Sequence, residues 1–315
     1  LLIEELRENL VQYSEDFSQS YWAKQVAGTG STPVVTASSL TDPAGGTGAY
    51  EVAFDAGAGT TSVDQSMLQT SGIGVTNGVD YTHSIWVRGD VGGEQIVVRG
   101  AGNAGFDLFT LTTGWTRISA TETASGTVAE LNFGIRQAVQ GTINSTATIH
   151  IYGAQLEQGS FATSYIPTNG TEVTREPDIA YMPVSEFNYN QSAGTIFVEV
   201  ESMRLAVVQR ILSINNSADA VNNRSDLLTT VGNTLQHSTV VGGVGVTDHS
   251  VSTLTSSLKV AATIAADDYS ASVDGGTVFS ETDGTPTVPT VDQIQIGGGV
   301  FSSFLNGHIK SLKYY

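Results

Sequence analysis

The stretch GAQLEQGSFATSYIPTNGTEVTREPD, residues 153–178, ends one kind of sequence and begins another. Its opening continues the alternating run ATIHIYGAQLE, residues 147–157, a pattern typical of a half-buried β-strand. Tyr165, Ile166 and Pro167 then form a short apolar patch that can hold the departing chain against the preceding strands. The polar, turn-rich run that follows is typical of a linker. The stretch therefore predicts the end of one β domain and the passage to a second.

Composition and patterning outside this stretch predict β structure. Glycine contributes 35 residues, charged residues are only 14%, and short alternating runs recur between turn signals. Strands are predicted at 81–89, 94–100, 115–122, 147–157, 194–201, 210–215, 258–265, 269–276, 292–298 and 308–315. Hairpin-type dipeptides punctuate the chain at Asn77-Gly78, Asp274-Gly275, Asp283-Gly284 and Asn306-Gly307.

The first ten residues, LLIEELRENL, have a different pattern. Leu2, Ile3, Leu6 and Leu10 recur at helical spacing, which predicts a short amphipathic helix over residues 1–10. Because so short a helix is marginal alone in water, it needs a partner. Either it packs on its own domain, or it is the tail of a coiled coil that bundles parallel chains.

Charge and hydropathy exclude some classes of partner. The chain of 315 residues has 31 acidic and 13 basic residues, a formal net charge of −18, which repels phosphate backbones. No apolar run approaches the roughly 20 residues that a membrane span needs. Cysteine is absent, so disulfides and thiolate metal sites are excluded. We expect neither nucleic acid nor membrane as a partner.

Several longer motifs resemble known modules. NLVQYSEDFSQSYWAKQ (9–25), GWTRISAT (114–121) and the run from Tyr152 to Asp178 resemble a module common in tail-fibre and other appendage proteins of tailed phages, a carbohydrate-binding-like sandwich of the jelly-roll type. YSASVDGGTVFSETDGTPTVPTVDQIQIGGG (269–299) and LNGHIKSLKYY (305–315) resemble a concanavalin/laminin-G-like sandwich. The resemblance implies a virion surface protein that contacts glycans.

The predicted fold class is all-β, with two antiparallel β-sandwiches, jelly-roll type and then concanavalin/laminin-G-like, after a short N-terminal helix. The predicted boundaries are 1–10 for the helix, 11–172 for the first sandwich, 173–193 for the linker and 194–315 for the second sandwich.

The predicted function is that of a non-enzymatic tail-fibre or spike protein on the virion surface. It would bind host cell-surface polysaccharide for adsorption and pack with other virion subunits, and a fibre architecture implies a homotrimer. Two alternatives stay open. One is a structural virion component, such as a capsid decoration or fibre module, and the other is a secreted glycan-acting enzyme or its binding module.

Glycan recognition by a sandwich requires an aromatic platform together with amide, guanidinium or carboxylate groups for the hydroxyls. Alternation along YTHSIWVR places Trp86 and Arg88 on one face and Tyr81, His83, Ile85 and Val87 on the other. Trp86 is therefore a candidate platform, although it can equally pack under a neighbouring strand or chain. The candidate residues for glycan binding are Trp86, Arg88, Arg99, Asn132 and Arg136.

Metal and catalytic candidates are fewer. The resemblance implies a structural calcium, for which Glu15, Asp16 and Glu157 are apt donors by position. Zinc is not expected because the histidines show no paired ligand spacing. His83 is expected to be packed or solvated.

For the enzyme alternative, Glu199 and Glu201 alternate along one strand face, about 6.6 Å apart. That separation is compatible with glycoside hydrolysis, but a solvated strand face gives the same pattern.

Overall fold

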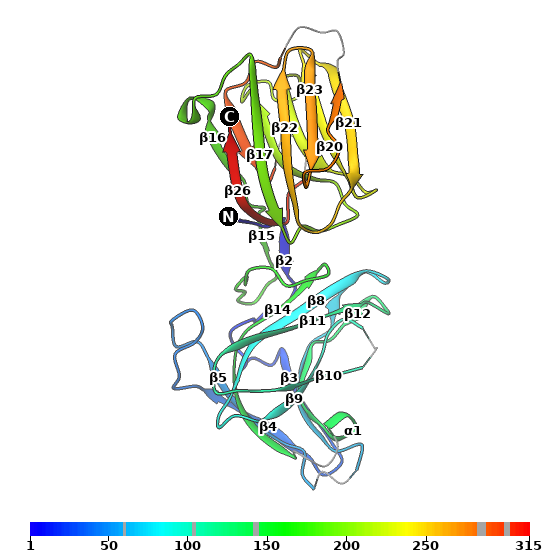
Figure 1. Cartoon of the computed structure of the whole chain (residues 1–315). Helices are drawn as coiled ribbons and strands as arrows, with labels where there is room; N and C mark the ends of the chain where they lie inside the picture. The colour runs from blue at the N-terminus through cyan, green and yellow to red at the C-terminus, as the bar shows by residue number, and fades with distance from the viewer. Residues whose placement is uncertain (59–60, 103–104, 141–144, 282–287, 299–302) are drawn as a thin grey trace. The chain divides into compact units, whose positions relative to one another are not determined.

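The computed structural model describes residues 1–58, 61–102, 105–140, 145–281, 288–298 and 303–315 (Figure 1). The Asp283-Gly284 turn predicted from the sequence lies outside them. The chain divides into two compact units. The N-terminal unit is Arg7–Arg175, and the C-terminal unit combines Leu1–Leu6 with Glu176–Tyr315.

Two five-stranded antiparallel sheets form the N-terminal unit. The β9 sheet has the order β10-β9-β13-β6-β3, with β10 (Asp107–Thr110), β9 (Gln95–Arg99), β13 (Asn132–Arg136), β6 (Gln65–Thr70) and β3 (Trp22–Ala27). The β8 sheet has the order β11-β8-β14-β5-β4, with β11 (Thr116–Thr123), β8 (Asp80–Gly89), β14 (Thr146–Gln158), β5 (Tyr50–Asp55) and β4 (Ser31–Ala37). Smaller elements are the pairs β7 (Ile73–Gly74) with β12 (Val128–Ala129) and β2 (Arg7–Asn9) with β15 (Val173–Arg175), and the helix α1 (Gln137–Gln140).

The core of this unit lies between its two sheets. Ile96, Val98 and Phe133 of the β9 sheet join Ile85 and Ile149 of the β8 sheet in one buried cluster. Because successive residues of a strand point to opposite faces, their neighbours in sequence point outward. Alternation therefore decides which side chains of each sheet can form a site on the outside of the sandwich.

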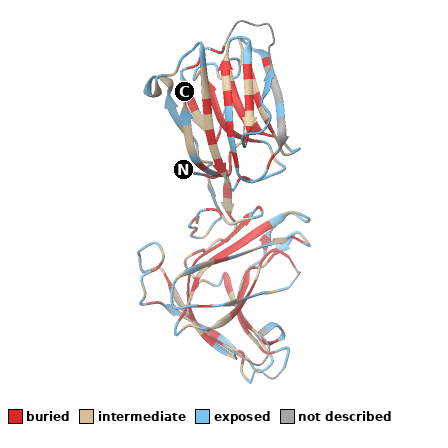
Figure 2. Cartoon of the chain, in the orientation of Figure 1, coloured by how far each residue is buried: buried red, intermediate tan, exposed pale blue. Residues whose placement is uncertain are grey.

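The C-terminal unit is a second pair of antiparallel sheets. The β17 sheet has the order β1-β26-β17-β22-β23-β24, with β1 (Leu2–Ile3), β26 (Gly307–Tyr314), β17 (Ala193–Glu201), β22 (Leu258–Ala265), β23 (Asp268–Val273) and β24 (Phe279–Glu281). The β18 sheet has the order β16-β25-β18-β19-β20-β21, with β16 (Ala180–Pro183), β25 (Gln293–Ile296), β18 (Gln209–Asn215), β19 (Arg224–Thr229), β20 (Thr234–Val241) and β21 (Val244–Thr253). Buried and less buried residues alternate along β17 and β22, which is the pattern of a sheet with one face on a core (Figure 2).

The all-β prediction with two antiparallel sandwiches is confirmed, and each of the ten predicted runs contains a strand. The Asp274-Gly275 turn is also confirmed. Both residues have positive φ, 52° and 72°, and Gly276 N donates to Val273 O at 2.8 Å. Such a two-residue turn with both φ positive favours glycine at its second position.

The helix predicted over residues 1–10 is wrong. Residues 2–3 form β1 on the edge of β26, and residues 7–9 form β2. Only Ile3 of the apolar stripe is fully buried, at 1% exposure, in the core of the C-terminal unit, whereas Leu2 and Leu6 are exposed. Pairing with an unpaired sheet edge and burial of Ile3 in an apolar core stabilise this segment more than a short isolated helix would. Tertiary contacts therefore override the local helical pattern. The coiled-coil interpretation loses its basis with the helix.

The segment 173–193, predicted as a linker, carries structure. Residues 173–175 are β15, which pairs with β2. Residues 180–183 are β16, which pairs with β25, and a 3-10 turn, η1 (Val184–Phe187), follows. Two parts of the predicted linker, residues 173–175 and 180–183, are therefore hydrogen-bonded in sheets.

Residues 153–178 fasten the end of the N-terminal unit to its beginning. The buried Asn9 side chain donates to Ala154 O at 3.1 Å and to Ile166 O at 2.8 Å, and it accepts from Val11 N and Leu156 N. Ile166 is buried, as the apolar patch predicted. No helix among the described residues is long and apolar enough to cross a membrane.

Candidate functional site

The five residues predicted to bind glycan lie on the two opposite outer faces of the N-terminal sandwich. Arg99 pairs with Asn132 across β9 and β13, and both alternate with the core residues Val98 and Phe133, so they lie on the outer side of the β9 sheet. Asn132 is nevertheless buried, at 3% exposure, and its side chain donates to Glu130 O. Arg136, four residues after Asn132 on β13, shares that face. Trp86 and Arg88 point outward from β8, as alternation predicted, but β8 belongs to the other sheet. The five residues therefore do not form one site.

An aromatic residue that sequence reasoning missed joins the first group. The ring of Phe106 lies under two guanidinium groups, with Arg99 Cζ 4.9 Å and Arg136 Cζ 5.0 Å from the ring centroid. These distances are within the range of cation–π attraction. We call Arg99, Phe106, Asn132 and Arg136 the Phe106 face. Phe106 lies just before β10 in a turn-rich segment that had no strand signal.

The surroundings of Trp86 are more crowded. Its cross-strand neighbours are Arg117 on β11 and Tyr152 on β14. A Cβ added at Gly153 would lie 3.3 Å from Trp86 Cδ1 and 3.1 Å from the Tyr165 ring, so glycine lets the indole pack against this segment. Trp86 is thus partly covered by its own chain, which leaves less of the ring open to a sugar.

The three carboxylates predicted to hold calcium each have protein partners. Glu15 accepts from the hydroxyls of Tyr152 and Tyr165. Asp16 accepts from Ser18, Gln19 and Tyr50. Glu157 is fully buried and accepts from Gln155 and Thr163. Among the described residues the three do not come together as one cluster of possible ligands. The structural calcium stays a prediction.

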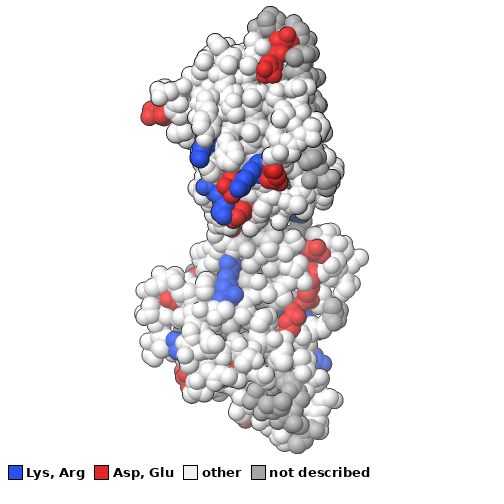
Figure 3. Space-filling model, viewed as in Figure 1, with Lys and Arg blue, Asp and Glu red and all other residues white. Residues whose placement is uncertain are grey.

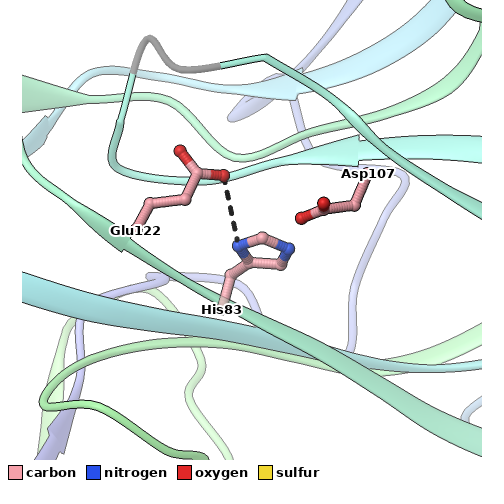
Figure 4. Close-up of side chains that lie close together, drawn as sticks. All are labelled: His83, Asp107 and Glu122. Carbon is pink, nitrogen blue, oxygen red and sulfur yellow. Dashed lines mark ion pairs between the residues drawn. The ribbon is translucent and has the colours of Figure 1, made fainter.

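A different cluster does come together. His83, Asp107 and Glu122 each offer a ligand atom, and these atoms lie within 4.8 Å of one another (Figure 4). His83 Nδ1 is 4.0 Å from Glu122 Oε1. His83 is 1% exposed, and neither of its ring nitrogens has a hydrogen-bond partner in the described part of the chain. Sequence reasoning placed His83 on one face of the strand with Tyr81, Ile85 and Val87, which are core residues, but it had no means of finding the neighbours of His83 on other strands.

Burial sets the protonation of this cluster. Burial lowers the pKa of His83 from 6.5 to about 4, so the imidazole is neutral at neutral pH. Burial also raises the pKa of Glu122, and the Asp107 carboxylate adds to the rise. Hydrogen bonds from Gly100 N at 2.9 Å and Gly102 N at 2.7 Å act against that rise and fix the orientation of the carboxylate.

The carboxylates of the enzyme alternative are paired with lysines. On the C-terminal unit, Glu201 Oε1 is 2.6 Å from Lys310 Nζ, and Glu199 Oε1 is 3.8 Å from Lys259 Nζ. Figure 3 shows acidic and basic side chains interleaved on this unit. A groove of about 450 Å³ beside them is lined by Phe197, Lys259, Ala261, Ser272, Asp274 and Gly275. These ion pairs are half-exposed, which is the environment of a solvated strand face.

Comparison with known proteins gives distant similarities only. No family model matches the chain, and no curated protein matches it. The carbohydrate-binding module CBM40 of the Ruminococcus gnavus IT-sialidase, bound to α2,3 sialyllactose, is similar at 17% identity with a TM-score of 0.35, over 40% of this chain and 76% of that one. The NanB sialidase of Streptococcus pneumoniae is similar at 15% identity with a TM-score of 0.35. The matched region covers 43% of this chain and 24% of that enzyme.

A third similar structure is that of domains LG4-5 of the mouse laminin α1 chain. It is 11% identical with a TM-score of 0.35, over 76% of this chain and 83% of that one. Similarities this distant assign no function, so the functional argument rests on the side chains themselves.

Proposed function

We propose that this chain is a non-enzymatic glycan-binding protein and that the Phe106 face is its binding surface. The observation that carries the proposal is the Phe106 ring held under the guanidinium groups of Arg99 and Arg136 on one outward sheet face. Each guanidinium presents five donors in a rigid fork that matches a carboxylate or a pair of hydroxyl oxygens. Stacking on the ring holds the forks in place, so less rotamer entropy is lost when a ligand binds.

The same face favours acidic glycans over neutral ones. The chain has 13 basic residues and 31 acidic residues, and two of the 13 basic residues, Arg99 and Arg136, share this face. A carboxylated sugar can form a bidentate pair with one arginine while its hydroxyls reach the other, and charge-assisted bonds are roughly twice as strong as neutral ones. We infer that the ligand is a glycan with carboxylate groups.

The biological setting that we propose is adsorption of a tailed phage to its host. The motifs at 9–25, 114–121 and 152–178, which resemble appendage modules, support a place on the virion surface in a tail fibre or spike. There the chain would bind host polysaccharide and pack with other virion subunits, and a homotrimer is the expected assembly. Weak single sites would gain avidity because several copies engage one polysaccharide. Measurement of the mass of the particle in solution tests the trimer.

The test of glycan binding is an array of acidic and neutral glycans probed with the full chain and four variants. Arg99→Ala and Arg136→Ala each remove one fork, and we expect at least a tenfold loss of binding to carboxylated glycans. Lys24→Ala, an exposed cation on β3 of the same sheet, is the control for loss of one positive charge and should keep full binding. Arg88→Ala reports on the Trp86 face, by which we mean Trp86 and Arg88 on the outer side of the β8 sheet.

Each outcome has a definite meaning. Binding lost in Arg88→Ala but kept in Arg99→Ala and Arg136→Ala would move the site to the Trp86 face. Wild-type protein that binds no glycan and no candidate host cell would overturn the proposal and favour a structural virion component. Release of sugar from any array glycan, abolished by Glu199→Gln or Glu201→Gln, would favour the enzyme alternative.

A further inference from the structure

His83 is an unusual residue to bury without a partner. It is 1% exposed, and both ring nitrogens are without a hydrogen bond in the described part of the chain. Buried side-chain nitrogens in native proteins nearly always have a partner, and exceptions point to a functional group or a bound water or ion. The other buried histidine of this unit, His150, does have partners at both ring nitrogens. Its Nδ1 is 2.9 Å from Ser38 Oγ, and its Nε2 is 3.5 Å from Asp90 Oδ1.

The strand register aims two carboxylates at this imidazole. Paired residues share a face, and His83 pairs with Ala120, so Glu122, two residues further on β11, points to the same inner side. Asp107 pairs with the core residue Val98 and therefore points inward from the β9 sheet. The three side chains converge, as Figure 4 shows, with His83 buried, Glu122 half-buried and Asp107 exposed.

Two glycines make room for this convergence. A Cβ at Gly100 would lie 2.3 Å from His83 Nδ1, and a Cβ at Gly102 would lie 2.7 Å from Glu122 Oε2. Any other residue would occupy the space beside the imidazole and the carboxylate. The backbone N–H groups of the same glycines hold Glu122 at 2.9 and 2.7 Å, an outer-shell arrangement like that which orients metal-binding carboxylates.

The geometry points to a divalent metal site of the zinc class, with His83, Asp107 and Glu122 as its protein ligands. In a tetrahedral zinc site with bonds of about 2.1 Å, neighbouring ligand atoms lie about 3.4 Å apart. The ligand atoms here lie within 4.8 Å, so side-chain movements of about 1 Å bring them into bonding distance. Three protein ligands leave a fourth position for water.

The ligand set decides which ion fits. A neutral imidazole suits zinc and its neighbours in the first transition row, while calcium and magnesium prefer oxygen donors throughout. Cysteine is absent from the chain, so a soft thiolate site is excluded. Zinc is not expected from the sequence because the histidines show no paired spacing along the chain, whereas the ligands proposed here come from two different sheets.

A bound ion would connect the two layers of the sandwich. His83 and Glu122 belong to the β8 sheet, and Asp107 belongs to β10, an edge strand that pairs only with β9 among the described strands. Because an ion that binds only the folded state stabilises it by mass action, zinc should raise the resistance of the N-terminal unit to unfolding. This inference is independent of the proposed glycan function, because it concerns the inner faces of the sheets.

The test uses the full chain, stripped with a chelator and dialysed, and titrated with Zn²⁺ alone by calorimetry. We expect one zinc per chain and a rise in the midpoint of urea unfolding. Tryptophan fluorescence follows that unfolding, because Trp22, Trp86 and Trp115 all lie in the N-terminal unit. Substitution by Co²⁺ should give the intense visible absorption of a low-coordinate site.

The variants assign the ligands. Asp107→Asn changes an exposed residue and should leave the fold intact, yet weaken zinc binding by more than about 100-fold, since outer-shell changes alone typically cost 10- to 100-fold. Asp90→Asn, beside the other buried histidine, is the matched control and should bind zinc normally. Absence of zinc binding, a Ca²⁺ preference at the same residues, or zinc binding kept in both Asp107→Asn and His83→Gln would overturn the inference.

Discussion

Asn9 is a buried polar residue whose side chain connects parts of the N-terminal unit that are distant in sequence. Its side chain is fully buried and makes four hydrogen bonds to backbone groups, two as donor and two as acceptor. Three of the partners, Ala154, Leu156 and Ile166, lie about 150 residues away in sequence. Asn9 therefore holds the start of the N-terminal sandwich against its last strand and the segment that follows.

The expected cost of Asn9→Ala follows from these four bonds. Each is worth about 1 kcal/mol net, which gives about 4 kcal/mol of unfolding free energy. The backbone groups left behind are buried, so no water replaces the lost partner cheaply. Typical domains are stable by roughly 5–15 kcal/mol, so the variant should fold but with a large part of its margin gone.

Urea unfolding followed by tryptophan fluorescence measures this loss, because the three tryptophans report on the N-terminal unit alone. Asn77→Ala, an exposed residue in the turn before β8, is the control and should change stability by less than about 0.5 kcal/mol. A folded Asn9→Ala variant that loses less than about 1 kcal/mol would show that residues 153–178 are held by something other than this side chain.

Two further predictions concern the core and acid stability. Ile3→Ala should destabilise the C-terminal unit by about 2–4 kcal/mol through the cavity it leaves, whereas Leu2→Ala, at 41% exposure, should have little effect; hydrogen exchange in β17 and β26 reads out both. Burial alone would raise the pKa of Asp16, but hydrogen bonds from Gln19, Ser18 and Tyr50 outweigh it and lower the pKa from 3.8 to about 2. A lowered folded-state pKa contributes stability that is present above pH 3.8 and is lost as the pH falls toward 2. The stability difference between wild type and Asp16→Asn should therefore shrink over that range in acid unfolding, and a constant difference would contradict this account.

Strands were predictable from the sequence because alternation is a local property. The runs at 81–89 and 147–157 became β8 and β14 almost residue for residue. Alternation placed Trp86 and Arg88 on the less buried face of β8, but in β14 a register shift between Tyr152 and Gln155 interrupts it and nearly every residue is buried. Residues 1–10 failed because their fate depends on a strand edge about 300 residues away, which no local pattern encodes. The spacing of Leu2, Ile3, Leu6 and Leu10 predicted an amphipathic helix, but in the fold only Ile3 is fully buried in a core.

The candidate sites were less predictable for a related reason. Arg99 and Asn132 were both candidates for glycan binding from the sequence, and they are cross-strand partners. Phe106 escaped notice because it lies in an irregular turn between strands, and the cluster around His83 depends on register and on two sheets facing each other. Residue types could be read from the sequence, but the pairing that brings them within a few ångströms is a property of the whole fold.

The position of β1 has a consequence for the order in which the protein forms during synthesis. The N-terminal unit is contiguous, so it can fold once Arg175 has been made, and domains generally do fold as the chain emerges. β1 precedes that unit in the chain but pairs with β26, which lies about 300 residues further along. Ile3 must therefore stay without its core while a complete sandwich forms behind it, and the C-terminal unit cannot complete this strand pairing until β26 has been made. We expect the second sandwich to be the slower and more aggregation-prone step, because contacts so distant in sequence are late to form.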